Sequence, residues 1–399
     1  MIIELDLIQT FMAAMIVLFT GYFITRRIPV LSKYSIPEPV VGGIIFALLV
    51  TFLKSGWDIG FKLDMTLKTP LMIAFFTTIG LGARLSLLKE GGIKVAMFLG
   101  ISVVLVMCQN IAGMTVAYLT DTHPLVGLLA GSITMVGGHG TGAAFAGSFL
   151  DSHNLQASME LAMAAATFGL VCGGIVGGPV ARKLIKKHNL KSTATEGIGQ
   201  LDVEEQNDEY DLTPNLLLEG MLVVSVPMAL GQILYLVVKG YGVTLPGFVW
   251  SLFLGIFILN AAEISGVYKV KAKAIDTIGT VSLSLFLAMA LMSLKLWELV
   301  NLAGPMLAIL ITQMVIVVSF AYFITFKIMG SNYDAAVMAA GQCGFGMGAT
   351  PTAVANMESV VAKYGAAPIA FLVVPLVGAF FIDIVNAGVI NFSLWIIGG

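Results

Sequence analysis

Ten apolar runs, each long enough to cross a membrane as a helix, constrain this chain more than any other feature of its sequence. About twenty apolar residues in helical form span the hydrocarbon core of a bilayer. Charged residues make up only 11% of the 399 positions, less than half of the roughly 25% in soluble domains. This composition excludes a soluble enzyme, a disordered chain and a nucleic-acid-binding protein. The runs are 7–25, 37–53, 69–88, 94–119, 156–181, 215–238, 244–262, 276–294, 303–326 and 366–396.

Two more apolar segments, 124–150 and 333–357, differ from these runs because they are dense in glycine and small polar residues. Seven glycines lie between Gly127 and Gly147, and four lie between Gly341 and Asn356. Glycine costs a helix interior close to 1 kcal/mol relative to alanine, and proline costs about 3. We therefore expect re-entrant hairpins or broken helices, which persist at membrane depth only where protein or a watery cavity shields their backbone.

The two halves of the chain match each other at a nearly constant offset. Ile36-Pro37 corresponds to Leu245-Pro246, and Gly138 corresponds to Gly348. Each half then holds five spans and one glycine-rich segment, and because five is odd the second half inserts upside down. We predict an all-α integral membrane protein of two inverted repeats, residues 1–181 and 214–399, joined by a charged linker, residues 182–213. Inverted repeats with broken elements are typical of secondary transporters, whose binding site lies where the repeats meet.

The basic residues predict the orientation of the chain. If each glycine-rich segment enters the membrane and leaves it on the same side, 16 of the 21 lysines and arginines lie on one side of the membrane. Loops rich in lysine and arginine stay in the cytoplasm. Both termini are then expected outside, with the linker in the cytoplasm.

The glycine-rich segments supply the candidate binding residues. Glycine allows the backbone to approach a ligand closely, and helix N-termini at a hairpin tip favour anions. Carbonyl and hydroxyl oxygens from the same loops suit a hard cation such as Na⁺. The alternative interpretation is that these glycines only permit close helix packing. The substrate-binding candidates are Ser132, Thr134, Gly137, Gly138, His139, Gly140 and Thr141 in the first segment, and Cys343, Gly344, Gly346, Thr350 and Thr352 in the second.

Asp383 is the one acidic residue deep within a span, which makes it a candidate cation ligand. Asn386 lies three positions later, so the two side chains share a helix face. Together with Asn356 of the second glycine-rich segment, they form the predicted Na⁺ site. A structural pair bonded to a neighbouring helix is the alternative for Asp383. For His139, a proton carrier, a substrate ligand and a neutral imidazole bonded to the loop all remain open.

No enzyme signature occurs in the sequence. It lacks HExxH, GxSxG and GxxxxGK[ST] motifs, and its three cysteines have neither metal-site spacing nor a disulfide framework. We therefore expect no catalytic residues and no cofactor. An intramembrane hydrolase or a sensor is the remaining alternative from another class.

Three strings resemble the bacterial sodium/glutamate symporter family: GSITMVGGHGTGAA at 131–144, GFGMGATPTA at 344–353 and FLVVPLVGAFFIDIVN at 371–386. The similarity covers essentially the whole chain. It implies Na⁺-coupled uptake of L-glutamate across the bacterial inner membrane, with Na⁺ as the coupling ion. It also implies opposed re-entrant loops, a homodimer and an elevator-like movement. With L-glutamate as the substrate, Asp383 is a candidate ligand either for Na⁺ or for the ammonium group of glutamate. A carrier for another small carboxylate, coupled to Na⁺ or H⁺, is the alternative within this class.

Overall fold

Helices account for nearly all of the computed structural model, which describes residues 2–29, 31, 37–85, 92–192, 212–239, 246–266, 268, 270–293 and 303–397. Eight described helices are long and apolar enough to cross a membrane. They are α1 (Leu7–Arg27), α3 (Glu38–Trp57), α6 (Gly92–Leu119), α9 (Ser158–His188), α10 (Pro214–Lys239), α11 (Gly247–Ser265), α12 (Ala272–Met292) and α13 (Ala303–Phe320), which continues through η4 (Ala321–Thr325) and α14 (Phe326–Ile328).

The other two predicted runs differ from single straight spans. The last one forms α17 (Pro368–Leu376), η5 (Val377–Phe381) and α18 (Ile382–Ile397), with a bend of 47°. Pro375 removes a backbone donor near this bend. The run 69–88 forms a shorter helix, α4 (Lys68–Gly82), of 15 residues.

Two short strands were not expected in an all-α chain. β1 (Ile2–Leu5) and β2 (Gly60–Leu63) pair in parallel, immediately before α1 and shortly before α4. Strands of four residues are too short to be recognised from alternating hydrophobicity. Several residues used in the predictions lie outside the described residues: Ile36 and Leu245 of the repeat match, Lys33, Lys89, Lys269 and Lys295 of the count of basic residues, and the linker positions 193–211.

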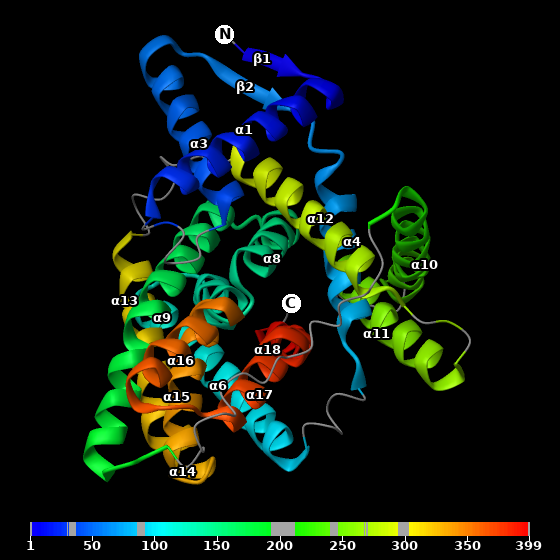
Figure 1. Cartoon of the computed structure of the whole chain (residues 1–399). Helices are drawn as coiled ribbons and strands as arrows, with labels where there is room; N and C mark the ends of the chain where they lie inside the picture. The colour runs from blue at the N-terminus through cyan, green and yellow to red at the C-terminus, as the bar shows by residue number, and fades with distance from the viewer. Residues whose placement is uncertain are drawn as a thin grey trace. The chain divides into compact units, whose positions relative to one another are not determined.

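The chain divides into two compact units, each built from both halves of the sequence. The first unit comprises Met1–Arg84, Asp151–Glu160 and Asn207–Val300, and the second comprises Leu85–Leu150, Leu161–Gln206 and Asn301–Gly399. The first unit thus holds α1, α3, α4, α10, α11 and α12 (Figure 1). The first three helices of each half therefore pack together, and the remaining elements of each half form the second unit.

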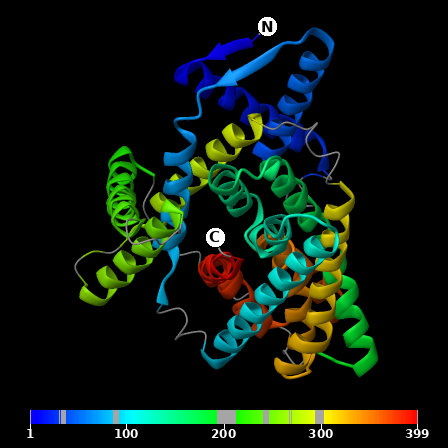
Figure 2. The same ribbon diagram turned by 180° about the vertical axis from the view of Figure 1, so that it is seen from behind.

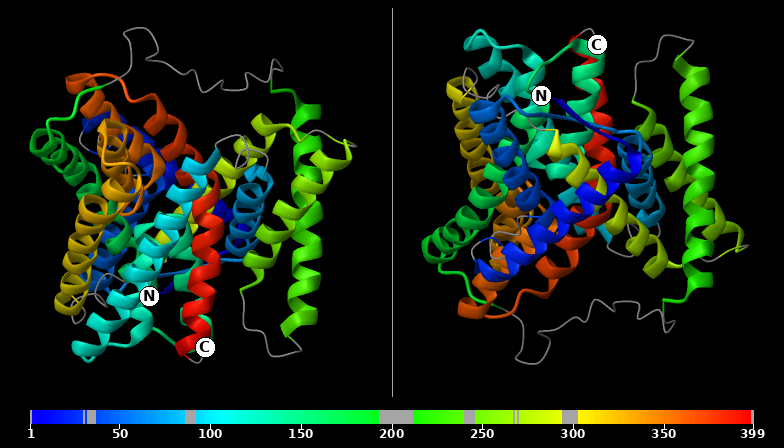
Figure 3. Two further views of the ribbon diagram at one scale, coloured as in Figure 1. Left: turned by 90° about the horizontal axis from the view of Figure 1, so that it is seen from below. Right: turned by 90° about the horizontal axis from the view of Figure 1, so that it is seen from above.

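In the first unit, corresponding helices of the two halves make corresponding contacts. α3 packs on α1 and α12, and α11 packs on α10 and α4. α3 and α11 begin at Glu38 and Gly247, which lie 209 positions apart. Figure 3 shows α10 running beside α11.

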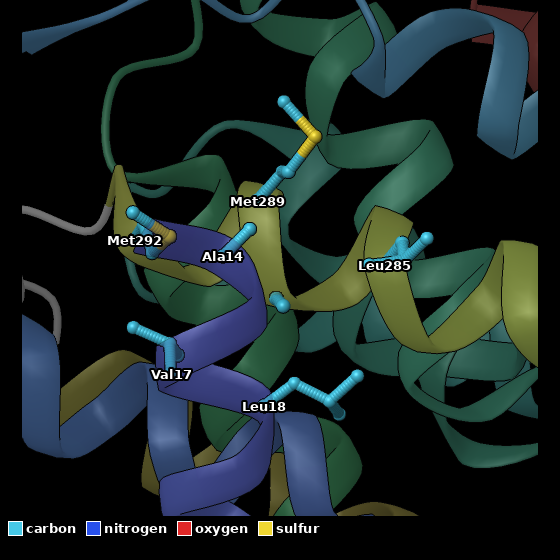
Figure 4. Packing of buried hydrophobic residues seen from close by; sticks show 7 residues of the cluster. Ala14, Val17, Leu18, Leu285, Met289 and Met292 are labelled. Atoms are coloured by element: carbon cyan, nitrogen blue, oxygen red, sulfur yellow. The ribbon is translucent and has the colours of Figure 1, made fainter. Parts of the chain in front are cut away.

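Close backbone contact and apolar side chains hold this unit together. A Cβ atom on Gly42 of α3 would lie 2.0 Å from the carbonyl oxygen of Val17 on α1, so only glycine fits at this crossing. Small residues allow such an approach between membrane helices. Helices α1 and α12 also contribute a buried apolar cluster (Figure 4) of Ala14, Val17, Leu18, Leu285, Ala288, Met289 and Met292.

Tyr268, between α11 and α12, makes stability of the first unit depend on pH. Its hydroxyl donates to Glu219 Oε1 at 2.6 Å. Burial, this hydrogen bond and the carboxylate charge raise the pKa of Tyr268. The unfolded chain therefore releases this proton first, so the stabilisation is complete below about pH 10 and is lost progressively above it.

We expect the melting temperature of the wild type in detergent to fall more steeply above about pH 10 than that of Tyr268→Phe, which has no proton to release. Circular dichroism melts at a series of pH values measure the slope. Tyr118→Phe, at an exposed position on α6, serves as the control and is expected to keep the wild-type slope. Equal slopes for the wild type and Tyr268→Phe would contradict the prediction.

Candidate functional site

The first glycine-rich segment is broken, as its composition predicts. α7 (Pro124–Leu128) continues into a π-helical turn, η1 (Leu129–Ile133), and α8 (Gly138–His153) follows. Gly131 lies inside η1 with a non-helical ψ of −137°, and Gly138 has a φ of +63°. Glycine reaches the left-handed region without the steric cost that a side chain imposes. We call residues 131–138 the first break.

The second glycine-rich segment is broken at the corresponding place. α15 (Tyr333–Phe345) ends in a turn over residues 346–348, and α16 (Thr350–Tyr364) follows. Ala349 is fully extended, with φ −161° and ψ 164°, and it supplies no side-chain cap to α16. An uncapped helix N-terminus presents free N–H groups and a partial positive charge. We call residues 345–350 the second break.

The two breaks lie next to each other within the second unit. A Cβ atom on Gly138 would lie 3.6 Å from the carbonyl oxygen of Gly348. Gly169 of α9 lies against the second break so closely that its Cβ would be 2.0 Å from the carbonyl oxygen of Met347. Glycine on α9 thus allows the second break to sit directly on that helix, beside the first break.

Helix α6 holds both breaks through two adjacent amide side chains. Gln109 donates from Nε2 to the carbonyl oxygen of Gly346 at 2.8 Å, in the second break. Asn110 accepts at Oδ1 from the N–H of Ser132 at 2.9 Å, in the first break. From the neighbouring α13, Gln313 donates to the main-chain oxygen of Gln109 at 2.8 Å. Figure 2 shows α6 and α13 side by side.

Helix α18 completes the surroundings of the first break. It packs along α6 (Figure 3), and Asn386 donates from Nδ2 to the carbonyl oxygen of Ser132 at 3.0 Å. Asparagine side chains thus bind both the N–H and the carbonyl oxygen of Ser132, and the carbonyl oxygen also accepts from the N–H groups of Val136 and Gly137 at 3.1 Å. The hydroxyl of Ser132 and Oδ1 of Asn386 are buried and have no hydrogen-bond partner among the described residues. Such unpaired buried oxygens require an explanation, for which a bound ion or water is one.

Asp383 lies one helical turn before Asn386 on the same face of α18 and is half-buried. Earlier on the same bent span, a Cβ on Gly378 would lie 3.0 Å from Oγ1 of Thr350 in the second break. The span therefore follows both breaks, and Asp383 lies between the points where it meets Thr350 and Ser132.

The third predicted Na⁺ ligand, Asn356, is hydrogen-bonded to other elements than Asn386 is. It donates from Nδ2 to the carbonyl oxygens of Gly173 at 2.8 Å and Ala340 at 3.3 Å, which join α16 to α9 and α15. The structure thus groups Asn386 with the first break and Asn356 with α9. Within the described ranges, no group of three or more His, Cys, Asp and Glu side chains could hold a metal ion. The candidate cation ligands beside the first break are therefore the single carboxylate of Asp383 together with amide, hydroxyl and carbonyl oxygens.

The other polar candidates of the first break are buried and partly engaged. Thr134 donates to the carbonyl oxygen of Leu129 at 2.8 Å. His139 makes a 3.0 Å hydrogen bond through Nε2 with Oγ1 of Thr167 on α9, so its ring is fixed between the first break and α9. Thr141 is buried in the first turn of α8, where Gly137 lies against its side chain and Gly140 precedes it.

The candidates of the second segment line the end of α15 and the start of α16. Cys343 and Gly344 are buried in the last turn of α15, and the backbone at Ala353 packs closely on Gly344. Thr352 is buried, and its hydroxyl has no hydrogen-bond partner in the described part of the chain. Oγ1 of Thr352 thus joins Oγ of Ser132 and Oδ1 of Asn386 as a buried oxygen with no hydrogen-bond partner among the described residues.

The sequence did not identify the role of Gln109 and Asn110. Amide side chains in the middle of a span usually form hydrogen bonds between helices, and Asn110 does so with Ser393 of α18. Gln109 and Asn110 also bind backbone at the two breaks, whose position in space the local sequence does not reveal. The available signal was the adjacency of two amides within one apolar span.

The family model described as sodium/glutamate symporter matches residues 3–366 of this chain. Among solved structures, a sodium proton antiporter from Methanocaldococcus jannaschii aligns over 98% of both chains, with 15% identity and a TM-score of 0.41. A sodium/glutamate symporter from Escherichia coli (strain K12) is 48% identical over 398 residues, which cover 98% of both chains. A sodium/glutamate symporter from Haemophilus influenzae is 45% identical over 393 residues, covering 98% of this chain and 97% of its own. By the extent of the family match and of these identities, this chain belongs to the sodium/glutamate symporter family.

Proposed function

We propose that this protein carries L-glutamate into the bacterial cell across the inner membrane together with Na⁺. The observation that carries the proposal is the meeting of two broken helices beside a buried set of unpaired oxygens, in a chain nearly half identical to proteins named sodium/glutamate symporters. Broken helices provide free N–H groups for an anion and free carbonyls for a cation at one place.

Glutamate binds where the two breaks adjoin. The N-terminus of α16 and the hydroxyls of Thr350 and Thr352 face its carboxylates, and the unpaired hydroxyl of Thr352 supports this placement. Ser132, Thr134, Gly137, Gly138, His139, Gly140 and Thr141 form the side of the site contributed by the first segment. Cys343, Gly344 and Gly346 complete the side contributed by the second.

Na⁺ binds beside the first break, on Asp383 and Oδ1 of Asn386. Na⁺ prefers oxygen ligands, and Oδ1 of Asn386 is buried without a partner. Asn356 offers its amide oxygen on the α9 side, because its amide nitrogen is already bound to Gly173 and Ala340. Binding of Na⁺ neutralises Asp383, which lowers the cost of moving the loaded site through the bilayer.

The architecture that fits this function is a pair of inverted repeats, with each broken segment re-entering the side it came from and both termini outside. The repeated order of elements and the sharing of each compact unit between both halves support it. In this proposal the second unit carries the loaded site in an elevator-like movement, and the protein works as a homodimer.

The driving force suffices for concentrative uptake. Accumulating a substrate one hundredfold costs about 2.8 kcal/mol, since each tenfold step costs 1.4 kcal/mol. One net positive charge crossing 100 mV supplies about 2.3 kcal/mol, and a small Na⁺ gradient supplies the remainder.

Uptake of labelled L-glutamate into proteoliposomes tests the proposed function. We expect accumulation with an inward Na⁺ gradient and none when choline replaces Na⁺. Accumulation that follows a proton gradient without Na⁺ would contradict the coupling ion. Stronger competition by another small carboxylate than by unlabelled glutamate would contradict the substrate.

A further inference from the structure

Gln109 and Asn110 connect the two breaks through a single turn of helix. Asn110 binds the N–H of Ser132 at 2.9 Å, and Gln109 binds the carbonyl oxygen of Gly346 at 2.8 Å. The two residues are neighbours on α6, so their Cα atoms are about 3.8 Å apart. Because both bonds come from one turn of α6, this helix fixes the position of one break relative to the other.

The two amides differ in how completely they are hydrogen-bonded: Gln109 bonds only through its nitrogen, and Asn110 bonds through both its oxygen and its nitrogen. Oε1 of Gln109 is fully buried and has no hydrogen-bond partner among the described residues. Leaving a buried amide oxygen unpaired is unfavourable, and an apolar side chain would avoid it. The amide nitrogen of Asn110 reaches Ser393 on α18 at 3.3 Å, which links α6 to the helix that carries Asn386.

The peptide of Ser132 is the point at which ion binding reaches this connection. Asn110 holds its N–H, and Asn386 holds its carbonyl oxygen. The unpaired oxygens, Oγ of Ser132 and Oδ1 of Asn386, belong to the two residues joined by that bond. A cation bound to these oxygens would restrain the backbone at Ser132, to which Asn110 of α6 is bonded.

We propose that Gln109 and Asn110 are positioning residues that couple Na⁺ binding at the first break to glutamate binding at the second. The inference rests on the proposed function. Na⁺ binding holds the backbone at Ser132 in one position, and the bond from Ser132 to Asn110 restrains one turn of α6. Gln109, on the same turn, then holds the Gly346 carbonyl in the position that glutamate binding requires. The coupling depends on the hydrogen bonds of Gln109 and Asn110 to the two breaks, so a variant that loses the coupling still binds Na⁺.

The test is the factor by which saturating Na⁺ tightens the binding of L-glutamate to purified full-length protein, measured by isothermal titration calorimetry with and without Na⁺. Coupling factors between two sites are typically about 5- to 150-fold. We expect Gln109→Met, which keeps the length of the side chain and removes its donor, to reduce the factor at least fivefold. Asn110→Ala is expected to reduce it to a similar extent.

Gln313→Met is the matched control. Gln313 is also a buried amide with one main-chain acceptor, but its bond ends on α6 and reaches neither break. We expect this variant to keep the wild-type coupling factor. The shift in melting temperature caused by Na⁺ alone, expected to be retained in Gln109→Met, shows that the variant is folded and binds the ion.

Two outcomes would overturn the inference: an unchanged coupling factor in Gln109→Met, or an equal loss in Gln313→Met. A merely structural role would weaken glutamate binding equally with and without Na⁺, which leaves the factor unchanged. Failure of the proposed function is distinguishable, because it would appear in the wild type as glutamate binding that does not depend on Na⁺.

Discussion

Replacing Asp383 by asparagine is expected to lower Na⁺-driven glutamate uptake at least one hundredfold. Asp383 is the acidic residue on the face of α18 that also presents Asn386 to the first break. Losing a charge-assisted contact to the ion costs about 3 kcal/mol. Each 1.4 kcal/mol is tenfold in affinity, so the Na⁺ affinity falls about one hundredfold. Initial rates of labelled glutamate uptake in proteoliposomes, at a series of Na⁺ concentrations, measure the change.

Glu358→Gln is the control for this substitution. Glu358 is an exposed carboxylate on α16 in the same compact unit, and we expect its removal to leave uptake within twofold of the wild type. Raising the Na⁺ concentration is expected to restore part of the rate of Asp383→Asn, because the defect lies in ion affinity. A wild-type dependence on Na⁺ in Asp383→Asn would show that the carboxylate is structural.

Replacing Gly169 by alanine is expected to disrupt the second break. The added Cβ atom would lie 2.0 Å from the carbonyl oxygen of Met347, a backbone atom that no rotamer change can move away. Forcing extra atoms into a packed interior costs about 1–3 kcal/mol, and we expect the upper end. A loss of about 3 kcal/mol lowers the melting temperature by about 6–12 °C in a unit of this size. Glutamate uptake is expected to fall more than tenfold.

Gly147→Ala provides a matched comparison. A Cβ atom on Gly147 meets nothing within 4 Å, and the residue lies inside α8. Alanine in a helix interior is favoured over glycine by about 1 kcal/mol, so this variant is expected to be as stable as the wild type or slightly more stable. Thermal melts in the same detergent compare the melting temperatures of Gly169→Ala and Gly147→Ala. Equal melting temperatures would contradict the close approach of α9 to the second break.

Much of the fold was predictable from local sequence. Long apolar runs specify helices because a bilayer leaves no other partner for backbone N–H and C=O groups. Both breaks were predictable because glycine and proline are costly in helix interiors, and Gly131 and Pro351 mark them. The spacing of Asp383 and Asn386 alone put both side chains on one helix face.

Other features of the fold depend on which helices pack against each other in the tertiary structure. The grouping of Asn356 with Asn386 stays a prediction, and the sequence did not indicate that Asn356 bonds to Gly173 and Asn386 to Ser132. The shorter α4 and the pairing of β1 with β2 were also not predicted. An amide side chain in an apolar span requires a hydrogen-bond partner, but the adjacent residues in the chain do not reveal which residue that partner is.

The sequence by itself therefore determined most of the spans, the two breaks and the residue types available at them, because these follow from short-range costs of burying backbone and charge. Only the tertiary structure decided that α6 holds both breaks through Gln109 and Asn110, and that α18 binds the Ser132 peptide. The physical reason is that apolar helix faces resemble one another in hydrophobicity. Their partners are selected by close backbone fit at glycines and by hydrogen bonds between residues far apart in the chain.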